Sequence, residues 1–278
     1  MWTHLKLGSR LGVSEKRLLI MKNNSFQQQM EGKGFDGKRG EVESRSQGSC
    51  KIKRDEHKLL VTKWATDAGI GVFAGIGGIG KTTIAKTVYN SNFDRFECSS
   101  FLLDIRETSK QPNGLVHLQE QLLSDISRCG KLKIGSVDEG MIKIKNAVSY
   151  RRVLVVLDNV DQLDHLNAVL GMRDWFCPGS KVIITKRYEK LLKPYKVDET
   201  FKVKEIDYNE SLRLFSWHAF RQAHPIECFM EYSKSVLQQC KGLPHALKLL
   251  GSSLRDRSAQ EWETSLEEME SFTGNQIL

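Results

Sequence analysis

The feature that most constrains the fold is a glycine-rich run followed by a lysine and two threonines, GIGGIGKTT at residues 75–83. It follows an apolar run, residues 70–74, and precedes residues 81–89, which we expect to be helical. The run matches the pattern G-x-x-x-x-G-K-[ST], whose backbone N–H groups curl around phosphate oxygens at the N-terminus of a helix. The sequence therefore predicts a strand, a phosphate-binding loop and a helix, in that order.

The residue types of the loop predict a role for each position. The glycines let the backbone approach an anion, Lys81 is expected to reach the β- and γ-phosphates, and the hydroxyl of Thr82 is expected to face Mg²⁺. A chance match by a glycine-rich turn is the alternative, and the flanking strand and helix argue against it. The candidate nucleotide-binding residues of the loop are Gly75, Gly77, Gly78, Ile79, Gly80, Lys81, Thr82 and Thr83.

Two further apolar runs end in charged residues. Residues 152–158 (RVLVVLD) end in Asp158, and residues 181–185 (KVIIT) are followed by Lys186 and Arg187. Ligands of open α/β sheets bind at the carboxyl ends of the strands. We therefore predict that Asp158 is the acidic element of the phosphate site and its catalytic candidate, and that a cation after the second run, Lys186 or Arg187, contacts the γ-phosphate. The alternatives are a capping or turn aspartate and a solvated basic turn.

Expected strands and helices alternate along the first two thirds of the chain. The apolar strands predict a parallel sheet that helices cover on both faces, an α/β fold of the P-loop NTPase class. The strands are expected at residues 70–74, 100–104, 152–158, 181–185 and 201–203, and the helices at residues 57–66, 81–89, 114–126, 137–149 and 163–170, with a short turn at 189–193.

A small all-helical part is expected to follow the sheet. Its helices are predicted at residues 209–220, with Asn209 as the cap, and at 226–241, 244–254 and 260–269. We therefore expect a tail at residues 1–55, a nucleotide-binding domain at 56–205 and a helical domain at 206–278.

Charge and cysteine usage exclude several classes of protein. The net charge of +8 belongs to the tail, because residues 1–54 hold 12 Lys and Arg against 5 Asp and Glu, whereas residues 55–278 hold 30 against 29. This argues against nucleic acid as a partner of the folded part. The six cysteines form no CxxC pair, which argues against zinc and a disulfide scaffold. No run is long and apolar enough to predict a membrane span.

In this order the motifs resemble the NB-ARC module of plant disease-resistance proteins. Besides the loop, the resemblance rests on VLVVLDNVD (153–161), GSKVIITKR (179–187) and GLPHALK (242–248), with FLLDIR (101–106) and LFSWHAF (214–220) as further motifs. The resemblance covers about residues 56–270. Asp161 stands where the coiled-coil class of that family usually has tryptophan, so at this position the chain resembles the TIR class. The resemblance implies a P-loop domain followed by an ARC1-like helical domain.

The resemblance also implies a function. In that family the module is an intracellular switch that holds ADP at rest and exchanges it for ATP on activation, with Mg²⁺. By position, the loop residues would hold phosphates, Asp158 would serve Mg²⁺, Arg187 would sense the nucleotide and Pro244 would close over it. A simple helix-starting proline is the alternative for Pro244. The resemblance implies a cytoplasmic location, with the nucleus as the alternative, and other immune-receptor or signalling proteins as partners through the helical domain.

Three positions depart from the family pattern. Asn159 stands where a second aspartate, the candidate base, is usual, and an amide cannot take a proton from water at neutral pH. Lys186 replaces a usual threonine and adds a cation near the phosphates. His245 replaces a usual leucine, and we expect a core histidine with a partner there rather than a ligand.

These observations leave three hypotheses for function. The first is a nucleotide-dependent switch or adaptor in defence, truncated because the sequence shows no TIR domain before the match and no second ARC unit or leucine-rich repeats after it. The second is a slow Mg²⁺-dependent ATPase, at most a weak one because of Asn159. The third is a degenerate decoy or relic without a nucleotide. The sequence predicts no oligomeric state and no pathogen signal.

Overall fold

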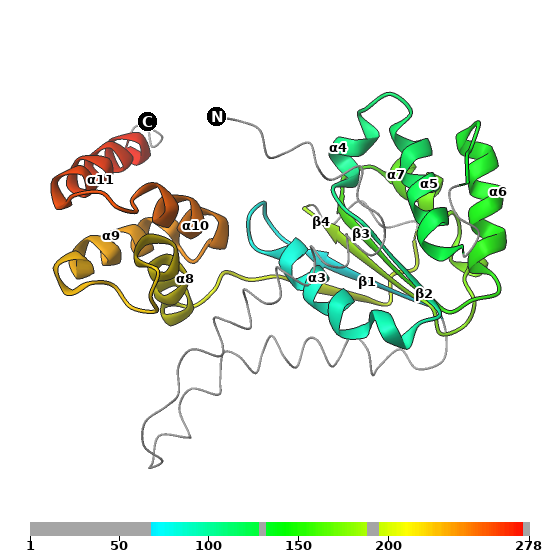
Figure 1. The fold of residues 1–278 in the computed structure, drawn as a ribbon, viewed down its shortest axis with the longest axis horizontal. Helices are drawn as coiled ribbons and strands as arrows, with labels where there is room; N and C mark the ends of the chain where they lie inside the picture. The colour runs from blue at the N-terminus through cyan, green and yellow to red at the C-terminus, as the bar shows by residue number, and fades with distance from the viewer. Residues whose placement is uncertain (1–67, 128–131, 188–194, 275–278) are drawn as a thin grey trace, which may run out of the picture. The chain divides into compact units, whose positions relative to one another are not determined.

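The computed structural model describes residues 68–127, 132–187 and 195–274, which form two compact units (Figure 1). Within these residues, one unit consists of 68–73 and 82–201, and the other of 74–81 and 202–274. The expected tail at 1–55, the helix at 57–66 and the turn at 189–193 lie outside the described residues.

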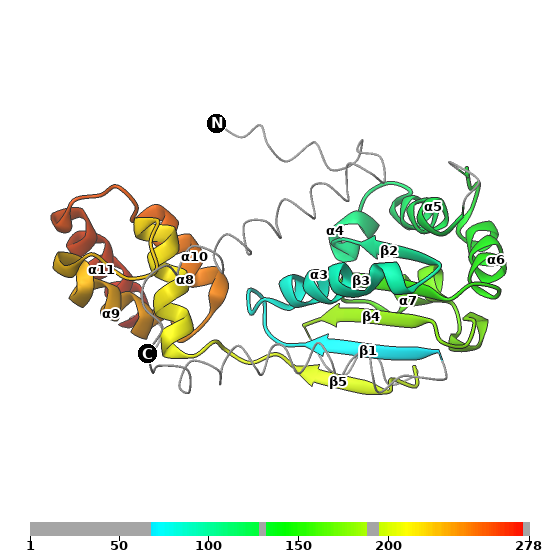
Figure 2. The ribbon, with the colours of Figure 1, turned by 60° about the horizontal axis from the view of Figure 1, so that its bottom comes forward.

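The first unit is built on a five-stranded parallel sheet in the order β2-β3-β4-β1-β5. Figure 2 shows β1, β4 and β5 as neighbouring arrows that point the same way, and β3 pairs in parallel with both β2 and β4. This confirms the predicted fold class. The strands are β1 (Gly69–Ala74), β2 (Cys98–Leu102), β3 (Val153–Val160), β4 (Lys181–Lys186) and β5 (Glu199–Lys202).

Apolar side chains on both faces of the central strands explain why the sheet is covered by helices. Every residue of β1 and β4 is buried, whereas the edge strand β5 alternates between half-buried and exposed residues. Helix α5 packs on β2 and also contacts α6 and α7. The helices of this unit in the described residues are α3 (Lys81–Asn92), α4 (Ile105–Ser109), α5 (Gly114–Ile126), α6 (Val137–Val148) and α7 (Leu163–Leu170).

The second unit has a helical core around Trp262, which is 1% exposed. Its ring lies 4.9–5.9 Å from those of Phe215, Phe220 and Phe229, and its Nε1 donates a 2.9 Å hydrogen bond to the carbonyl of Leu254. The described helices of this unit are α8 (Tyr208–Phe220), α9 (Met230–Cys240), α10 (Pro244–Ser253) and α11 (Ala259–Gly274). They are joined because each contributes a buried apolar side chain to the core around the Trp262 ring, α10 through Leu247.

Three predicted boundaries are wrong, each for a reason that the structure shows. The strand expected at 100–104 is β2, Cys98–Leu102, because Asp104 has a left-handed φ of 51° that no strand accommodates. Helix α8 is capped by Asp207, whose carboxylate accepts a 2.8 Å hydrogen bond from the N–H of Glu210, and not by Asn209. Helix α9 begins only at Met230, after a 3₁₀ turn.

None of the helices in the described part of the chain combines the length and the apolar composition of a membrane-spanning segment.

Candidate phosphate-binding site

The glycine-rich loop connects β1 to α3, and its backbone requires glycine at two positions. Gly78 has a φ of 79° and Gly80 a φ of 100°, both in the range that residues with a side chain rarely adopt. The side chain of Lys81, only 8% exposed, folds back over the loop and donates hydrogen bonds of 2.8 Å to the carbonyls of Gly75 and Ile76. The ammonium group thus lies within the loop, where the sequence predicted a phosphate contact.

Residues 75–81 of the loop belong to the second unit, together with helices α8 to α11. This part of the loop contacts the start of α10. The carbonyl of Gly78 accepts a 3.1 Å hydrogen bond from the N–H of His245, and a Cβ added at Gly78 would lie 2.7 Å from the Cβ of His245. Pro244 occupies the first turn of α10, immediately before His245. The first turn of α10 therefore lies against the loop.

The prediction of a core histidine at position 245 is wrong. His245 is exposed at the second residue of α10, and its backbone N–H donates a hydrogen bond to the loop.

A continuous chain of hydrogen bonds runs across the carboxyl ends of the strands in the first unit. The buried carboxylate of Asp158 accepts hydrogen bonds through Oδ1 from the hydroxyls of Thr82 and Thr185, at 2.7 Å each. Thr185 Oγ1 in turn accepts a 2.8 Å hydrogen bond from the N–H of Asn159. Asn159 Nδ2 then donates to Oδ1 of Asp104 at 2.7 Å. Residues of α3, β3, β4 and the segment after β2 are thereby joined.

A β-bulge in β3 places Asn159 in this chain. Leu157 pairs with Ile184 and Val160 with Lys186, so β3 uses one more residue than β4 over this stretch. Asn159 takes a left-handed φ of 57°, which asparagine tolerates better than most residues. The bulge turns two successive side chains of β3 to different partners.

An ion pair also joins the region after β2 to the region at the end of β3. Nε of Arg106, in α4, lies 2.9 Å from Oδ2 of Asp161, which follows β3. Nδ1 of His165 lies 3.4 Å from the other oxygen of Asp161. The segment after β2 is therefore joined to the end of β3 by the hydrogen bond from Asn159 to Asp104, and to the residue that follows β3 by the ion pair between Arg106 and Asp161.

The two basic residues at the end of β4, Lys186 and Arg187, lie in different environments. Lys186 is 3% exposed as the last residue of β4, whereas Arg187 is exposed. The hydrogen bond from Lys110 holds the pKa of Glu107 below its ordinary value, and the charges of Arg106 and Arg187 act in the same direction. Arg187 thus contributes to a positive field beside α4.

The structure brings some candidate residues together and separates others by environment. Lys81 lies within the loop and Thr82 bonds Asp158 directly, whereas Ile79 is buried and offers only its backbone. Thr83 and Gly77 are exposed. Sequence reasoning missed Thr185 and Asp104, although both lie at the ends of predicted strands, where polar residues merit attention.

The residues present fit a magnesium ion. The hydroxyl of Thr82 and the carboxylate of Asp158 are hard oxygen ligands that lie 2.7 Å apart. Mg²⁺ in nucleotide sites is held by one or two such groups, with phosphates and water completing the octahedron. Among the described residues no group of three or more His, Cys, Asp or Glu side chains is placed to hold a metal ion.

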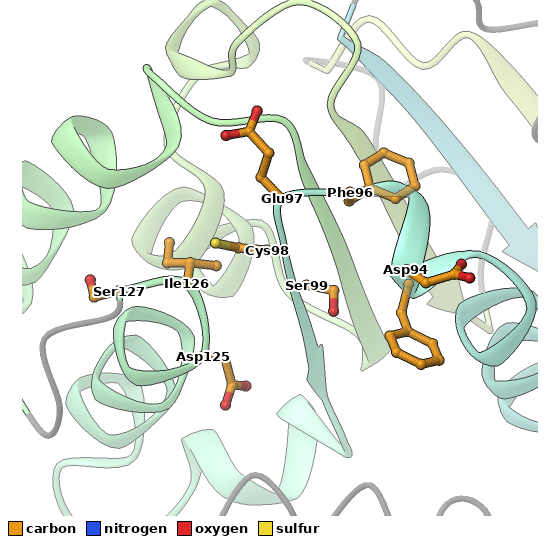
Figure 3. A pocket seen from close by; sticks show the side chains of 9 residues that line it. Asp94, Phe96, Glu97, Cys98, Ser99, Asp125, Ile126 and Ser127 are labelled. Carbon is orange, nitrogen blue, oxygen red and sulfur yellow. The ribbon is translucent and has the colours of Figure 1, made fainter.

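A separate hollow of about 250 Å³ lies at the opposite end of β2 (Figure 3). The side chains around it come from the start of β2, such as Cys98 and Ser99, and from the end of α5, such as Asp125. Ser99 accepts a hydrogen bond from the hydroxyl of Tyr89, and Asp125 accepts one from Ser100. The hollow is thus remote from the carboxyl ends of the strands and from the hydrogen-bonded chain.

The parallel sheet, the glycine-rich loop and the acidic end of β3 define the P-loop NTPase fold. The model of the NB-ARC domain matches residues 53–224, more than half of the chain. The chain therefore belongs to the NB-ARC family, as its motifs predicted.

Curated relatives are plant disease-resistance proteins. The chain is 43% identical over 203 residues to disease resistance protein RPV1 of Vitis rotundifolia, covering 73% of this chain and 14% of the relative. It is 36% identical over 209 residues to TMV resistance protein N of Nicotiana glutinosa, covering 72% and 18%. The chain thus spans less than a fifth of the length of these relatives.

Among solved structures, Cdc6p of Pyrobaculum aerophilum has a TM-score of 0.48 and 11% identity, covering 80% of this chain and 63% of that chain.

Proposed function

We propose that this chain is the adenine-nucleotide-binding module of a plant defence protein, that it holds ADP or ATP with Mg²⁺, and that it acts as a nucleotide-dependent signalling switch or adaptor. The NB-ARC match and the disease-resistance relatives support a role in defence. The observation that carries the proposal is the 2.7 Å hydrogen bond between Thr82, at the start of α3, and the buried Asp158. It joins the two elements that a P-loop protein uses for Mg²⁺ and phosphate.

In this proposal the loop binds the phosphates. Backbone N–H groups of residues 75–83 surround the anion, the ammonium of Lys81 exchanges its loop carbonyls for the β- and γ-phosphates, and Thr82 and Asp158 hold Mg²⁺. When bound, the metal neutralises charge on the phosphates. Burial of Lys81 and Asp158 strengthens these interactions, because few water dipoles screen them.

Two exposed or half-buried residues would make the module responsive to the nucleotide. Arg187 would contact the γ-phosphate and so distinguish ATP from ADP. Pro244, at the first turn of α10, would contact the nucleotide from the helical unit, because α10 starts against Gly78. A nucleotide shifts a switch only through different contacts in its two states, and these two residues supply such contacts. We further propose a cytoplasmic location and immune-receptor or signalling proteins as partners.

The nucleotide content of the purified protein tests this proposal. The protein is denatured, and the released material is separated by ion-exchange chromatography and compared with the protein concentration. Stoichiometric ADP or ATP supports the module. An empty site that also binds neither nucleotide with Mg²⁺ in titration calorimetry contradicts it and favours the decoy or relic.

The substitution Lys81→Ala assigns binding to the loop. Loss of an ammonium that bonds phosphate removes a charge-assisted interaction, and we expect affinity to fall by about 100-fold or more. The control is Lys86→Ala, which removes the same charge from α3 five residues further on. Equal affinities in Lys81→Ala and the unsubstituted protein would rule out the loop assignment.

A further inference from the structure

The carboxylate of Asp104 is oriented in an unusual way. Asp104 is the N-cap residue of α4, a position where an aspartate side chain usually accepts a hydrogen bond from a helix N–H. Here the side chain makes no such bond, and its Oδ1 accepts instead from Nδ2 of Asn159 at 2.7 Å. The backbone carbonyl of Asp104 accepts hydrogen bonds from the N–H groups of Glu107 and Thr108, as the carbonyl of an N-cap residue ordinarily does.

The geometry leaves the second oxygen of Asp104 available. Within residues 68–127, 132–187 and 195–274, no hydrogen bond or ion pair engages Oδ2 of Asp104, and the residue is half-buried. The amide of Asn159 can only donate to the carboxylate through Nδ2, so it fixes the orientation of Asp104 without taking its proton-accepting capacity. The ion pair between Arg106 and Asp161 holds the same two segments a second time.

Asp104 is connected to the candidate metal ligand Asp158 by three short hydrogen bonds that pass through two intermediate residues. From Asp158 the chain passes through Thr185 and Asn159 to Asp104, with distances of 2.7, 2.8 and 2.7 Å. The strand ends of β2 and β3 are adjacent because Leu102 pairs with Leu157. A carboxylate therefore remains beside the amide that replaces the usual second aspartate, on the neighbouring segment.

From this arrangement we infer that Asp104 is the general base for hydrolysis of the bound nucleoside triphosphate, oriented by Asn159. The inference rests on the proposed nucleotide binding. Water forms a bond to the γ-phosphorus and passes a proton to Oδ2 of Asp104. The bond between the γ-phosphorus and the oxygen that bridges to the β-phosphate breaks, and the electron pair stays on the diphosphate. Asp104 then releases the proton to solvent, leaving ADP, phosphate and one proton.

The test is single-turnover hydrolysis of γ-labelled ATP with Mg²⁺ by Asp104→Asn, with ATP binding measured on the same samples by calorimetry. The amide oxygen of asparagine still accepts the hydrogen bond from Asn159, so a merely structural role survives this change, whereas the base does not. We expect ATP affinity within about threefold of the unsubstituted protein and hydrolysis slower by about 10²- to 10⁴-fold. The matched control, Asp164→Asn, removes an exposed carboxylate from α7 and leaves both quantities unchanged.

Several outcomes separate this inference from the proposed function. Binding of ATP with hydrolysis in Asp104→Asn within threefold of the unsubstituted protein overturns the inference alone. Binding without any hydrolysis by the unsubstituted protein does the same. Failure of the unsubstituted protein to bind ATP overturns both. If Asp104→Asn does not fold, Asp104→Ser provides the same comparison, with the same expected loss of hydrolysis and the same result that would contradict it.

Discussion

The hydroxyl of Thr185 lies 2.7 Å from Oδ1 of Asp158, and the same hydroxyl accepts a 2.8 Å hydrogen bond from the N–H of Asn159. One side chain of β4 thus fixes two successive residues of the bulge in β3. The carboxylate of Asp158 is 3% exposed, so it depends on hydroxyl donors from the protein. Thr185 is therefore a structural support of the candidate metal ligand.

Thr185→Val tests this support because valine has the shape of threonine without the hydroxyl. The change removes one donor from Asp158 and leaves the N–H of Asn159 without its partner. We expect the free energy of unfolding to fall by about 1–3 kcal/mol, measured by urea denaturation. Thr200→Val, on the exposed face of the edge strand β5, is the control. Equal stability losses in the two variants would contradict a specific role for Thr185.

Trp262→Ala tests the core of the helical unit. The substitution removes a ring that contacts Phe215, Phe220 and Phe229 and leaves the carbonyl of Leu254 without its 2.9 Å donor. We expect a loss of about 3–5 kcal/mol in urea denaturation followed by helical circular dichroism. Trp262→Phe should lose less because it keeps a ring. Tyr150→Ala, at a residue 84% exposed, should lose almost nothing, and a comparable loss there would argue against the cluster as the core.

The thiol of Cys240 should make stability depend on alkaline pH. Burial raises its pKa from 9.0 to about 11, so the folded protein holds this proton more tightly than the unfolded chain. The contribution of this thiol to the free energy of unfolding is fully present below pH 9. It is lost as the pH rises from 9 to 11, by about 3 kcal/mol at most.

The measurement is the difference in unfolding free energy between the unsubstituted protein and Cys240→Ala, at pH 8 and at pH 10.5. Groups common to both proteins cancel in this difference, so the advantage of cysteine over alanine should shrink at pH 10.5. Cys228→Ala, at an exposed thiol, should show no such change. A pH-independent difference for Cys240 would refute the assignment.

The sequence predicted helix boundaries well where burial of one apolar face determines the helix. Helices α5 and α7 begin and end at the predicted residues because their apolar spacing gives each one buried face. The end of β2 was misplaced because Asp104 adopts a left-handed backbone, and such a conformation depends on contacts with distant residues such as Asn159. Boundaries set by tertiary contacts are not encoded in local patterns.

The candidate site was predictable only in part, for a related reason. The spacing of the loop and the acidic strand end indicated Lys81, Thr82 and Asp158, because those motifs are local in the sequence. Thr185 and Asp104 act through hydrogen bonds to residues 27 and 55 positions away. The bulge in β3 decides those partners, and neither hydrophobic periodicity nor a motif specifies where an extra residue enters a parallel ladder.

Replacing Asn159 by the aspartate usual in the family should destabilise this particular chain. Asn159→Asp would place a second carboxylate about where Nδ2 now donates to Asp104, and two like charges at hydrogen-bond distance repel. We expect a loss of about 1–3 kcal/mol in urea denaturation at pH 7. The double variant Asp104→Asn with Asn159→Asp restores one amide and one carboxylate in exchanged positions, and it should recover most of that stability. If the double variant is as unstable as Asn159→Asp, the two side chains are not energetically coupled, and the pairing of Asp104 with Asn159 contributes nothing specific to the fold.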